Sequence, residues 1–228
     1  MFFTSSLLSE VPGLRHGFGS ALEPIPQVFG EQIIWDEVKP KWKQVHGTKI
    51  VEVVKLSQEL GETDAMWTRA QATPLACVTA DCVPIIMAKK DGTAIATIHA
   101  GWRGTHDLIP QKIWKSIAQT GERPENWVAA LGPSIGPCCY EVSTELAQDF
   151  LKTFAWISPA MILPNKKNQR MLDLQSILLG QLESLGIQEI DVLPVCTRCS
   201  QTEGKWLLNS FRRDGTAGRQ FAVALISG

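Results

Sequence analysis

The chain has 228 residues, 44% of them hydrophobic, and a formal net charge of −1. This composition predicts one domain, residues 1–228, with a substantial core, and the near-zero charge excludes the basic surface expected of a nucleic-acid or anionic-membrane binder. No run of about 18 apolar residues could span a membrane, and no basic region opens a signal peptide, so we expect a cytoplasmic protein with reduced cysteines.

The first third of the chain predicts short strands rather than helices. Residues 57–64 are polar and predict a loop, and prolines interrupt residues 20–40, where no element is assigned. A strand at 41–45 runs into Gln44-Val45-His46-Gly47, which places a histidine beside a glycine at a strand end. Strands are predicted, from β-branched and apolar composition, at 14–18, 41–45, 49–54, 65–68 and 75–79.

A hairpin is predicted at the middle of the chain. Two apolar runs, Val83–Ala88 and Thr93–Ile98, are joined by a turn that contains Asp91-Gly92, a strong hairpin signal. Cys82 stands at the start of the first run and His99 at the end of the second. In an antiparallel pair these two positions meet, so the hairpin presents a thiol and an imidazole at one end.

Helical periodicity dominates after this hairpin. A glycine-bracketed turn, Gly101–Gly104, leads into a helix with Thr105 or Asp107 as its cap, and Ser143 and Asp173 begin two more. Gly186 is placed to end the third helix. Strands follow at 127–131, 189–193 and 221–226. About ten strands and three helices, with strands both clustered and interleaved, predict a mixed α and β fold.

Two histidines beside strand ends and one cysteine form a candidate metal site. Thiolate and neutral imidazole are good ligands for zinc or copper, and three protein ligands leave a catalytic position open. His46, Cys82 and His99 would supply such a set. The wide gaps between them match no compact ligand motif, so ordinary core or turn roles remain the alternative.

Neighbouring charged residues add candidates of lower specificity. Asp81 could orient a ligand or cap a turn, and Arg103 lies where a turn enters a helix, a position that favours anions. Arg212 and Arg213, in Phe211-Arg212-Arg213-Asp214, could bind an anionic substrate or pair with carboxylates on the surface.

Two cysteine pairs stand apart from these candidates. Cys138 and Cys139 are adjacent, and we expect them to be buried as small apolar residues. Cys196 and Cys199 have the spacing of a zinc half-site or a redox pair, but a lone pair of this kind is a weak signal.

Taken together, these stretches resemble the laccase-domain family, also called multicopper polyphenol oxidoreductase or YfiH-like proteins. The matching segments run in the family order and cover nearly the whole chain: His16-Gly17-Phe18, Gln44-Val45-His46-Gly47, Thr63-Asp64-Ala65, Thr79-Ala80-Asp81-Cys82-Val83-Pro84, His99-Ala100-Gly101-Trp102-Arg103-Gly104, the stretch 132–142, and Phe211-Arg212-Arg213-Asp214 with Thr216, Gly218 and Arg219.

The resemblance implies a single mixed α/β (α+β) domain of CNF/YfiH-like topology, with mixed β-sheets flanked by about three helices. It implies one metal ion, Zn²⁺ with Cu²⁺ possible, on His46, Cys82 and His99. It also implies a catalytic role for Cys82, His99, Arg103 and Asp81, and substrate binding by Arg103, Arg213 and Glu141. Members have been described as phenol-oxidising laccases and as purine nucleoside enzymes, and some are linked to editing of peptidoglycan precursors.

We therefore expect a metal-dependent enzyme that phosphorolyses adenosine, inosine, guanosine and methylthioadenosine and deaminates adenosine. Its partners would be a purine nucleoside and phosphate, and its state a monomer or weak homodimer. Four histidines cannot supply a multicopper centre. The alternatives are a Cys/His hydrolase with Cys82 as nucleophile, a single-metal phenol oxidase, and a non-catalytic member. The last is favoured by a short loop after Phe18 that lacks the arginine of relatives.

Overall fold

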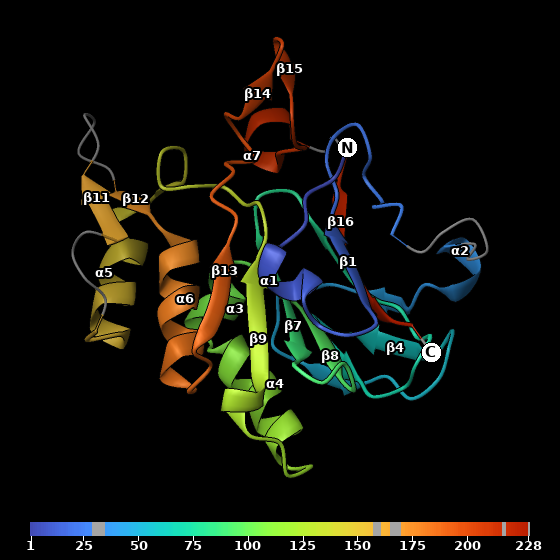
Figure 1. Cartoon of the computed structure of the whole chain (residues 1–228). Helices are drawn as coiled ribbons and strands as arrows, with labels where there is room; N and C mark the ends of the chain where they lie inside the picture. Colours follow the sequence, from blue (N-terminus) through green and yellow to red (C-terminus); the bar gives the residue numbers. More distant parts are fainter. Residues whose placement is uncertain (29–34, 157–160, 165–169, 216–217, 228) are drawn as a thin grey trace.

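The computed structural model describes residues 1–28, 35–156, 161–164, 170–215 and 218–227. Its centre is a mixed sheet of six strands in the order β13-β9-β7-β8-β5-β3, seen in the middle of Figure 1. The four inner strands pair antiparallel, whereas β13 and β3 join the two edges in parallel. The strands are β3 (Ile50–Glu52), β5 (Ala65–Thr68), β7 (Val83–Lys89), β8 (Ile95–Ala100), β9 (Trp127–Leu131) and β13 (Glu189–Val192).

The two central strands, β7 and β8, form the predicted hairpin. The Gly92 amide donates to the Lys89 carbonyl to close the turn, and a φ of 72° at Gly92 favours glycine. A side chain at this position would also collide with the carbonyl of Pro12. Because Pro84 pairs with His99, the residues just before β7 lie beside the end of β8.

Both faces of the central sheet are covered, which explains why β7 is apolar along its whole length. Val83, Ile85 and Met87 pack in one hydrophobic cluster, and Ile86 and Ala88 in a second on the opposite face. Helices α4 (Ile109–Ala118) and α6 (Leu174–Ser184) contribute to the first cluster. The second is completed by helix α1 (Ser6–Ser9) and a three-stranded antiparallel sheet of β1 (Leu14–Phe18), β16 (Gln220–Ile226) and β6 (Leu75–Thr79).

Three helices of ten or eleven residues correspond to the three predicted ones: α4 (Ile109–Ala118), α5 (Thr144–Thr153) and α6 (Leu174–Ser184). The Ser143 side chain accepts from the amide of Leu146 at the start of α5, and that of Asp173 accepts from the amide of Ser176 at the start of α6. Gly186, with a φ of 94°, follows the end of α6 as predicted.

The predicted cap of the first helix is wrong. The chain forms a short helix α3 (Trp102–His106), turns at Leu108 with a φ of 60°, and only then begins α4. Pro110 lies in the first turn of α4. In one continuous helix its ring would clash with the carbonyl four residues earlier, so the helix starts after Leu108 rather than at Thr105 or Asp107.

The predicted loop at 57–64 is also wrong, because it contains strand β4 (Glu59–Glu62) paired in parallel with β2 (Lys41–Lys43). Ion pairs join Lys41 to Glu59 at 3.2 Å and Lys43 to Glu62 at 3.0 Å across the two strands. Leu60, buried in the core, is the only apolar side chain of β4, so the strand lacks the alternation of apolar and polar residues that identifies a strand in sequence.

The remaining elements are short. Helix α2 (Trp35–Val38) lies within the stretch 20–40, to which the sequence assigns no element. Residues 29–34 of that stretch fall outside the described residues, as does Thr216 of the last family segment. One small sheet consists of β10 (Glu141–Val142), β12 (Arg170–Leu172) and β11 (Ile162–Pro164). The other short elements are the hairpin of β14 (Gln201–Thr202) and β15 (Lys205–Trp206), α7 (Phe211–Asp214) and the 3-10 helix η1 (Pro124–Asn126). Figure 1 shows β14, β15 and α7 together at one end of the molecule.

The predicted fold class, a mixed α and β arrangement of several sheets, is confirmed. The additional helices α1, α2, α3 and α7 are only four or five residues long, below what sequence periodicity detects. Across the described residues, no helix has the length and apolar character needed to cross a bilayer.

His16 on β1 is expected to make stability pH-dependent. Its Nε2 accepts from the Ser5 amide at 3.0 Å, and burial lowers its pKa from 6.5 to about 4. Between these values the unfolded chain takes up a proton that the native chain does not, so stability falls as pH falls, by on the order of 3 kcal/mol. Urea unfolding of His16→Gln and wild type from pH 7 to 4 should give a shallower pH slope for the variant. Equal slopes would contradict this assignment.

Candidate functional site

Three ligand-bearing side chains from distant segments meet at the end of the central hairpin. His46 follows β2, Cys82 precedes β7, and His99 lies on β8. One ligand atom from each lies within 4.8 Å of the others. The two imidazole rings contact edge to face, with centroids 4.8 Å apart. The structure therefore brings together the three residues that the resemblance proposed as metal ligands.

A buried carboxylate, Asp64, holds this arrangement from behind. Its Oδ2 accepts from the amides of Val45 at 3.2 Å and Gly47 at 2.8 Å. Its Oδ1 accepts from the His46 amide at 2.9 Å and lies 2.8 Å from Nδ1 of His99. Three consecutive amides thus wrap one carboxylate, which requires His46 to adopt a left-handed φ of 59°.

The charge of Asp64 determines how His99 is presented. Burial would raise the pKa of Asp64, but hydrogen bonds from His99, Gly47 and Val45 outweigh it and lower the pKa below its usual value. The ionised carboxylate accepts the Nδ1 proton of His99. Nε2 is then the nitrogen left to face the site, which is how carboxylates orient metal-binding histidines.

Cys82 and His99 favour each other's charged forms. Burial opposes both charges, but attraction to His99 and hydrogen bonds from both histidines lower the pKa of Cys82 to about 6. The attraction of the Cys82 thiolate and the hydrogen bond to Asp64 raise the pKa of His99 to about 9. A thiolate forms readily here, and thiolate is the form of cysteine that binds a metal or acts as a nucleophile.

Gly101 packs closely against two of the three donor residues. A Cβ at Gly101 would lie 3.0 Å from Sγ of Cys82 and 3.1 Å from Cδ2 of His46. Real Cβ atoms rarely approach so closely, so a side chain here would push one of these donors aside. One thiolate and two imidazoles suit zinc or copper in the donor types they provide.

A cleft of about 1010 Å³ lies over His46, Cys82 and His99. Its aromatic lining residues are Trp42, Tyr140, Phe211 and Phe221, and its basic lining residues are Lys39, Lys41, Lys43, Arg212 and Arg219. Lys41 and Lys43 pair with Glu59 and Glu62 across β2 and β4. The cleft therefore combines flat apolar faces with the two guanidinium groups of Arg212 and Arg219.

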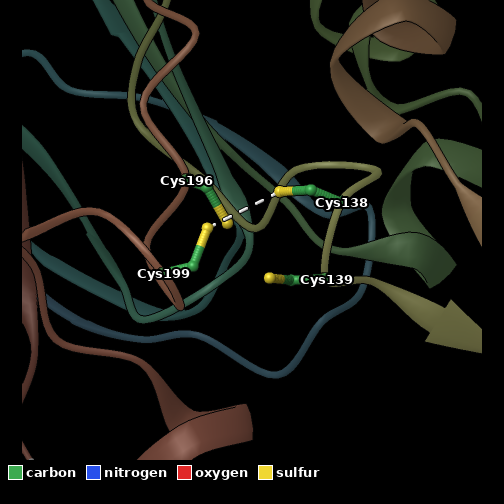
Figure 2. A group of neighbouring side chains, drawn as sticks. All are labelled: Cys138, Cys139, Cys196 and Cys199. Carbon is green, nitrogen blue, oxygen red and sulfur yellow. Dashed lines mark hydrogen bonds between the residues drawn. The ribbon is translucent and has the colours of Figure 1, made fainter.

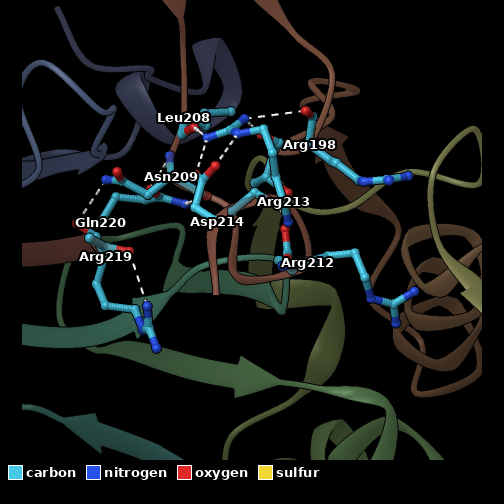
Figure 3. A network of polar contacts seen from close by, with 12 residues as sticks. Arg198, Leu208, Asn209, Arg212, Arg213, Asp214, Arg219 and Gln220 are labelled. Atoms are coloured by element: carbon cyan, nitrogen blue, oxygen red, sulfur yellow. Dashed lines mark hydrogen bonds and ion pairs between the residues drawn. The ribbon is translucent and has the colours of Figure 1, made fainter. Parts of the chain in front are cut away.

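Arg213, expected to bind substrate, has a supporting position in the fold instead. Its guanidinium donates to the carbonyls of Thr197, Arg198 and Leu208 and to the carboxylate of Asp214, which occupies its five N–H groups. Figure 3 shows this network around Arg213, while Arg212 and Arg219 extend away from it. The cleft is lined by these two neighbours and not by Arg213.

Asp81 lines the cleft, but its carboxylate is engaged with the C-terminal part of the chain. It accepts from Thr197 Oγ1 and from the Arg212 amide, both at 2.6 Å. Asp81 itself has a left-handed φ of 98°. These contacts tie the turn that carries Cys82 to the start of α7, so a positioning role fits the geometry better than proton transfer.

Neither of the two other predicted substrate contacts, Arg103 and Glu141, lines the cleft. Arg103 is exposed, with its guanidinium 4.4 Å from the centroid of the Trp102 ring. Glu141 contributes its carbonyl, which accepts from Arg212 at 2.8 Å, and it does not line the cleft. Its neighbour Tyr140 does. Burial and the nearby Cys82 charge raise the pKa of Tyr140 to about 12, against the opposing effect of Arg212.

Sequence reasoning gave no role to Asp64, Tyr140 and Arg219, and of the two arginines Arg212 and Arg213 it carried only Arg213 forward as a substrate contact. Asp64 and Tyr140 lie within segments that match the family, and Tyr140 is the chain's single tyrosine. Those signals marked the positions but not their partners. The choice between Arg212 and Arg213 depends on which way each side chain leaves a four-residue helix, which spacing does not reveal.

The remaining histidines have other surroundings. His16 is buried against Ser5, and His106 contacts Asp149 at 3.0 Å and Thr153 at 3.1 Å. Neither belongs to a group of potential metal ligands among the described residues.

The sequence matches the family described as multi-copper polyphenol oxidoreductase laccase over residues 32–227. Purine nucleoside phosphorylase YfiH of Escherichia coli (strain K12) is 33% identical over 182 residues, covering 79% of this chain and 71% of that protein. Purine nucleoside phosphorylase YlmD of Geobacillus stearothermophilus is 34% identical over 195 residues, covering 79% and 69%.

Solved structures agree with these matches. The crystal structure of YlmD from Geobacillus stearothermophilus superposes with a TM-score of 0.82 at 25% identity, covering 100% of this chain and 99% of that one. A Neisseria meningitidis protein gives a TM-score of 0.80 at 21% identity, with the same coverage, and shows the likeness of fold alone.

Replacing Asp64 by Asn should weaken metal binding. Asn has one acceptor oxygen in place of two, so with that oxygen on the amides of Val45 and Gly47 its NH2 group faces Nδ1 of His99 and cannot accept from it. Loss of such a contact costs about 10- to 100-fold in metal affinity. Zinc affinity is measured by competition with a chromophoric chelator in chains that also carry Cys196→Ser and Cys199→Ser, so that zinc on cysteines outside this site does not contribute. Asp107→Asn, beside the surface residue His106, is the matched control and should match wild type. Equal zinc affinities for the two variants would contradict the role of Asp64.

Gly101→Ala should disturb the same site by steric pressure. The new methyl group must displace Cys82 Sγ or the His46 ring, and overpacking of this kind costs about 1–3 kcal/mol, so zinc affinity should fall about tenfold. Gly104→Ala is the control, because its Cβ would meet nothing nearer than 3.5 Å. If both variants bind zinc like wild type, the close packing of Gly101 against Cys82 and His46 does not influence zinc binding.

Proposed function

This chain belongs to the family described as multi-copper polyphenol oxidoreductase laccase, and we propose that it is a metal-dependent purine nucleoside phosphorylase. Its substrates would be adenosine, inosine, guanosine and methylthioadenosine, and it would also deaminate adenosine. The observation that carries the proposal is a single set of one thiolate and two imidazoles opening into an aromatic cleft with two arginines. The names of the YfiH and YlmD relatives favour the same activity.

The cleft has the chemical groups that a nucleoside and phosphate require. Tyr140, Phe211 and Phe221 offer faces on which a purine can stack. Arg212 and Arg219 supply N–H donors suited to a phosphate dianion. Arg103, on the neighbouring helix, is a further candidate for this anion, whereas the five contacts of Arg213 argue against it.

In phosphorolysis a phosphate oxygen bonds to the anomeric carbon as the glycosidic C–N bond breaks, and the base leaves with a proton. We assign Arg212 and Arg219 to hold phosphate in line with that carbon, which replaces a bimolecular encounter by a positioned one. Tyr140 keeps its phenolic proton at neutral pH, since its pKa is about 12. Its Oη can therefore donate a hydrogen bond to substrate.

The metal ion that we propose is zinc, with copper as the alternative, on His46, Cys82 and His99. With three protein ligands, such an ion supplies an electrophilic centre with an open position. Asp64 would keep His99 in the required tautomer. For deamination, water adds at the six-carbon of adenine and ammonia leaves, and the same cleft would orient the base for that reaction.

Multicopper oxidation does not fit the residues present. A type 1 site and a trinuclear cluster need many imidazole ligands, and the whole chain has four histidines. Of these, His16 and His106 are engaged elsewhere. A single-metal phenol oxidase requires only the proposed site, and oxidation of a phenol under oxygen tests it directly.

A Cys/His hydrolase is the second candidate, because Cys82, His99 and Asp64 also form a nucleophile, a base and an orienting carboxylate. The substrate would be an amide, such as a cell-wall peptide. The position of His46 favours the metal enzyme, since a triad has no need of a second imidazole in contact with His99. Amidase activity that survives chelation and is abolished by alkylation of Cys82 would favour the hydrolase.

The proposed activity is tested with zinc-loaded protein, adenosine or inosine, and phosphate, with products separated chromatographically. We expect free base and ribose 1-phosphate only with phosphate, and inosine from adenosine. His46→Ala should abolish turnover. Arg212→Ala should raise KM for phosphate about tenfold or more, the value of hydrogen bonds to a charged group.

Arg123→Ala is the matched control, because Arg123 pairs with Glu125 on the surface and does not line the cleft. Its kinetics should equal those of wild type. A zinc-loaded protein that binds nucleosides but yields neither base nor inosine would contradict the enzyme assignment and support a non-catalytic member.

A further inference from the structure

Four cysteines outside the site described above converge at one point of the fold. Cys138 and Cys139 lie just before β10, and Cys196 and Cys199 just before β14. Figure 2 shows the four side chains pointing toward a common centre from two separate loops. Their sulfur atoms all lie within 4.8 Å of one another. Cys196 and Cys199 alone are a weak signal for a metal site, but the fold brings the second pair, Cys138 and Cys139, beside them.

The sulfur separations suit a single tetrahedral ion. With Zn–S bonds of about 2.3 Å, the sulfurs of a tetrahedral site lie about 3.8 Å apart. Cys138 and Cys199 are already 3.7 Å apart. Because all four sulfurs lie within 4.8 Å of one another, a movement of at most about 1 Å would bring every pair to this distance. A disulfide would use only two of these sulfurs and would not account for four converging on one centre.

Both loops are held in place by their own hydrogen bonds. The Gly136 amide donates to Sγ of Cys196 at 3.4 Å, and Cys196 forms an isolated bridge with Ser134. The Thr197 amide donates to the Ser134 carbonyl at 2.9 Å. Arg213 donates to the carbonyls of Thr197 and Arg198, which fixes the backbone between Cys196 and Cys199. The cysteines are thus presented on a prearranged backbone.

We propose that Cys138, Cys139, Cys196 and Cys199 bind a structural zinc ion as four thiolates. Four protein ligands leave no open position, which distinguishes this site from the three-ligand site at Cys82. Cys139 and Cys196 are buried, while Cys138 and Cys199 are exposed, so an ion can enter from the surface.

The zinc ion would brace one wall of the cleft. Cys139 directly precedes Tyr140, and Thr197, between the two later cysteines, donates to Asp81 at 2.6 Å. Asp81 in turn accepts from the Arg212 amide. A cross-link between the two loops therefore restrains three cleft residues, and its loss should lower thermal stability as well as zinc content.

The test isolates this site by working in full-length Cys82→Ser, which removes a ligand from the other one. This variant should bind one equivalent of Zn²⁺ per chain, measured by elemental analysis after removal of free metal. Loaded with Co²⁺, it should show the strong thiolate charge-transfer and visible bands of a tetrahedral four-sulfur site. Addition of Cys196→Ser and Cys199→Ser should abolish both signals.

A measurement without the cysteine substitutions keeps the test sound if the triple variant does not fold. Under non-reducing denaturing conditions with chelator, all six thiols of the wild-type chain should react with a thiol reagent. Two unreactive thiols, mapped by mass spectrometry to a Cys138–Cys199 disulfide, would overturn the proposal. So would Cys82→Ser protein that takes up neither Zn²⁺ nor Co²⁺.

Discussion

The site depends on how one buried carboxylate is satisfied. Asp64 is desolvated, and an ionised group in that position requires several donors. It finds them in three successive amides, at Val45, His46 and Gly47, and in the ring of His99. The same contacts turn the chain so that His46 meets His99, and they fix which nitrogen of His99 faces the cleft. The hydrogen bonds of Asp64 thus fix both the local path of the chain and the orientation of the two histidine ligands.

The rest of the fold supplies the surroundings for that interaction. The β7–β8 hairpin, covered on both faces, holds Cys82 and His99 rigidly at one end. The C-terminal segment closes over this end through Arg212 and Arg219, and Asp81 joins the two parts. We propose that the four-cysteine zinc site braces the same junction from outside, so that one ion acts in chemistry and another in stability.

Much of this could be predicted from local signals. The hairpin follows from Asp91-Gly92 between apolar runs, and the meeting of Cys82 with His99 follows from antiparallel pairing. Helices α4 to α6 follow from periodicity. Strand β4 could not be predicted, because Leu60 is its only apolar side chain and the charged residues around it indicate a loop. The role of Arg213 and the four-cysteine cluster depend on contacts between segments far apart in sequence, which no local pattern encodes.

The central claim is that His46, Cys82 and His99 hold one metal ion beneath a nucleoside-binding cleft. Anomalous diffraction at the zinc edge, from crystals of zinc-loaded protein grown with inosine and phosphate, tests it most directly. We expect an anomalous peak at about 2.0–2.3 Å from Cys82 Sγ, His99 Nε2 and a His46 nitrogen, with the nucleoside stacked above it near Tyr140. Full occupancy by nucleoside with no anomalous peak among these three residues would show that they hold no metal ion.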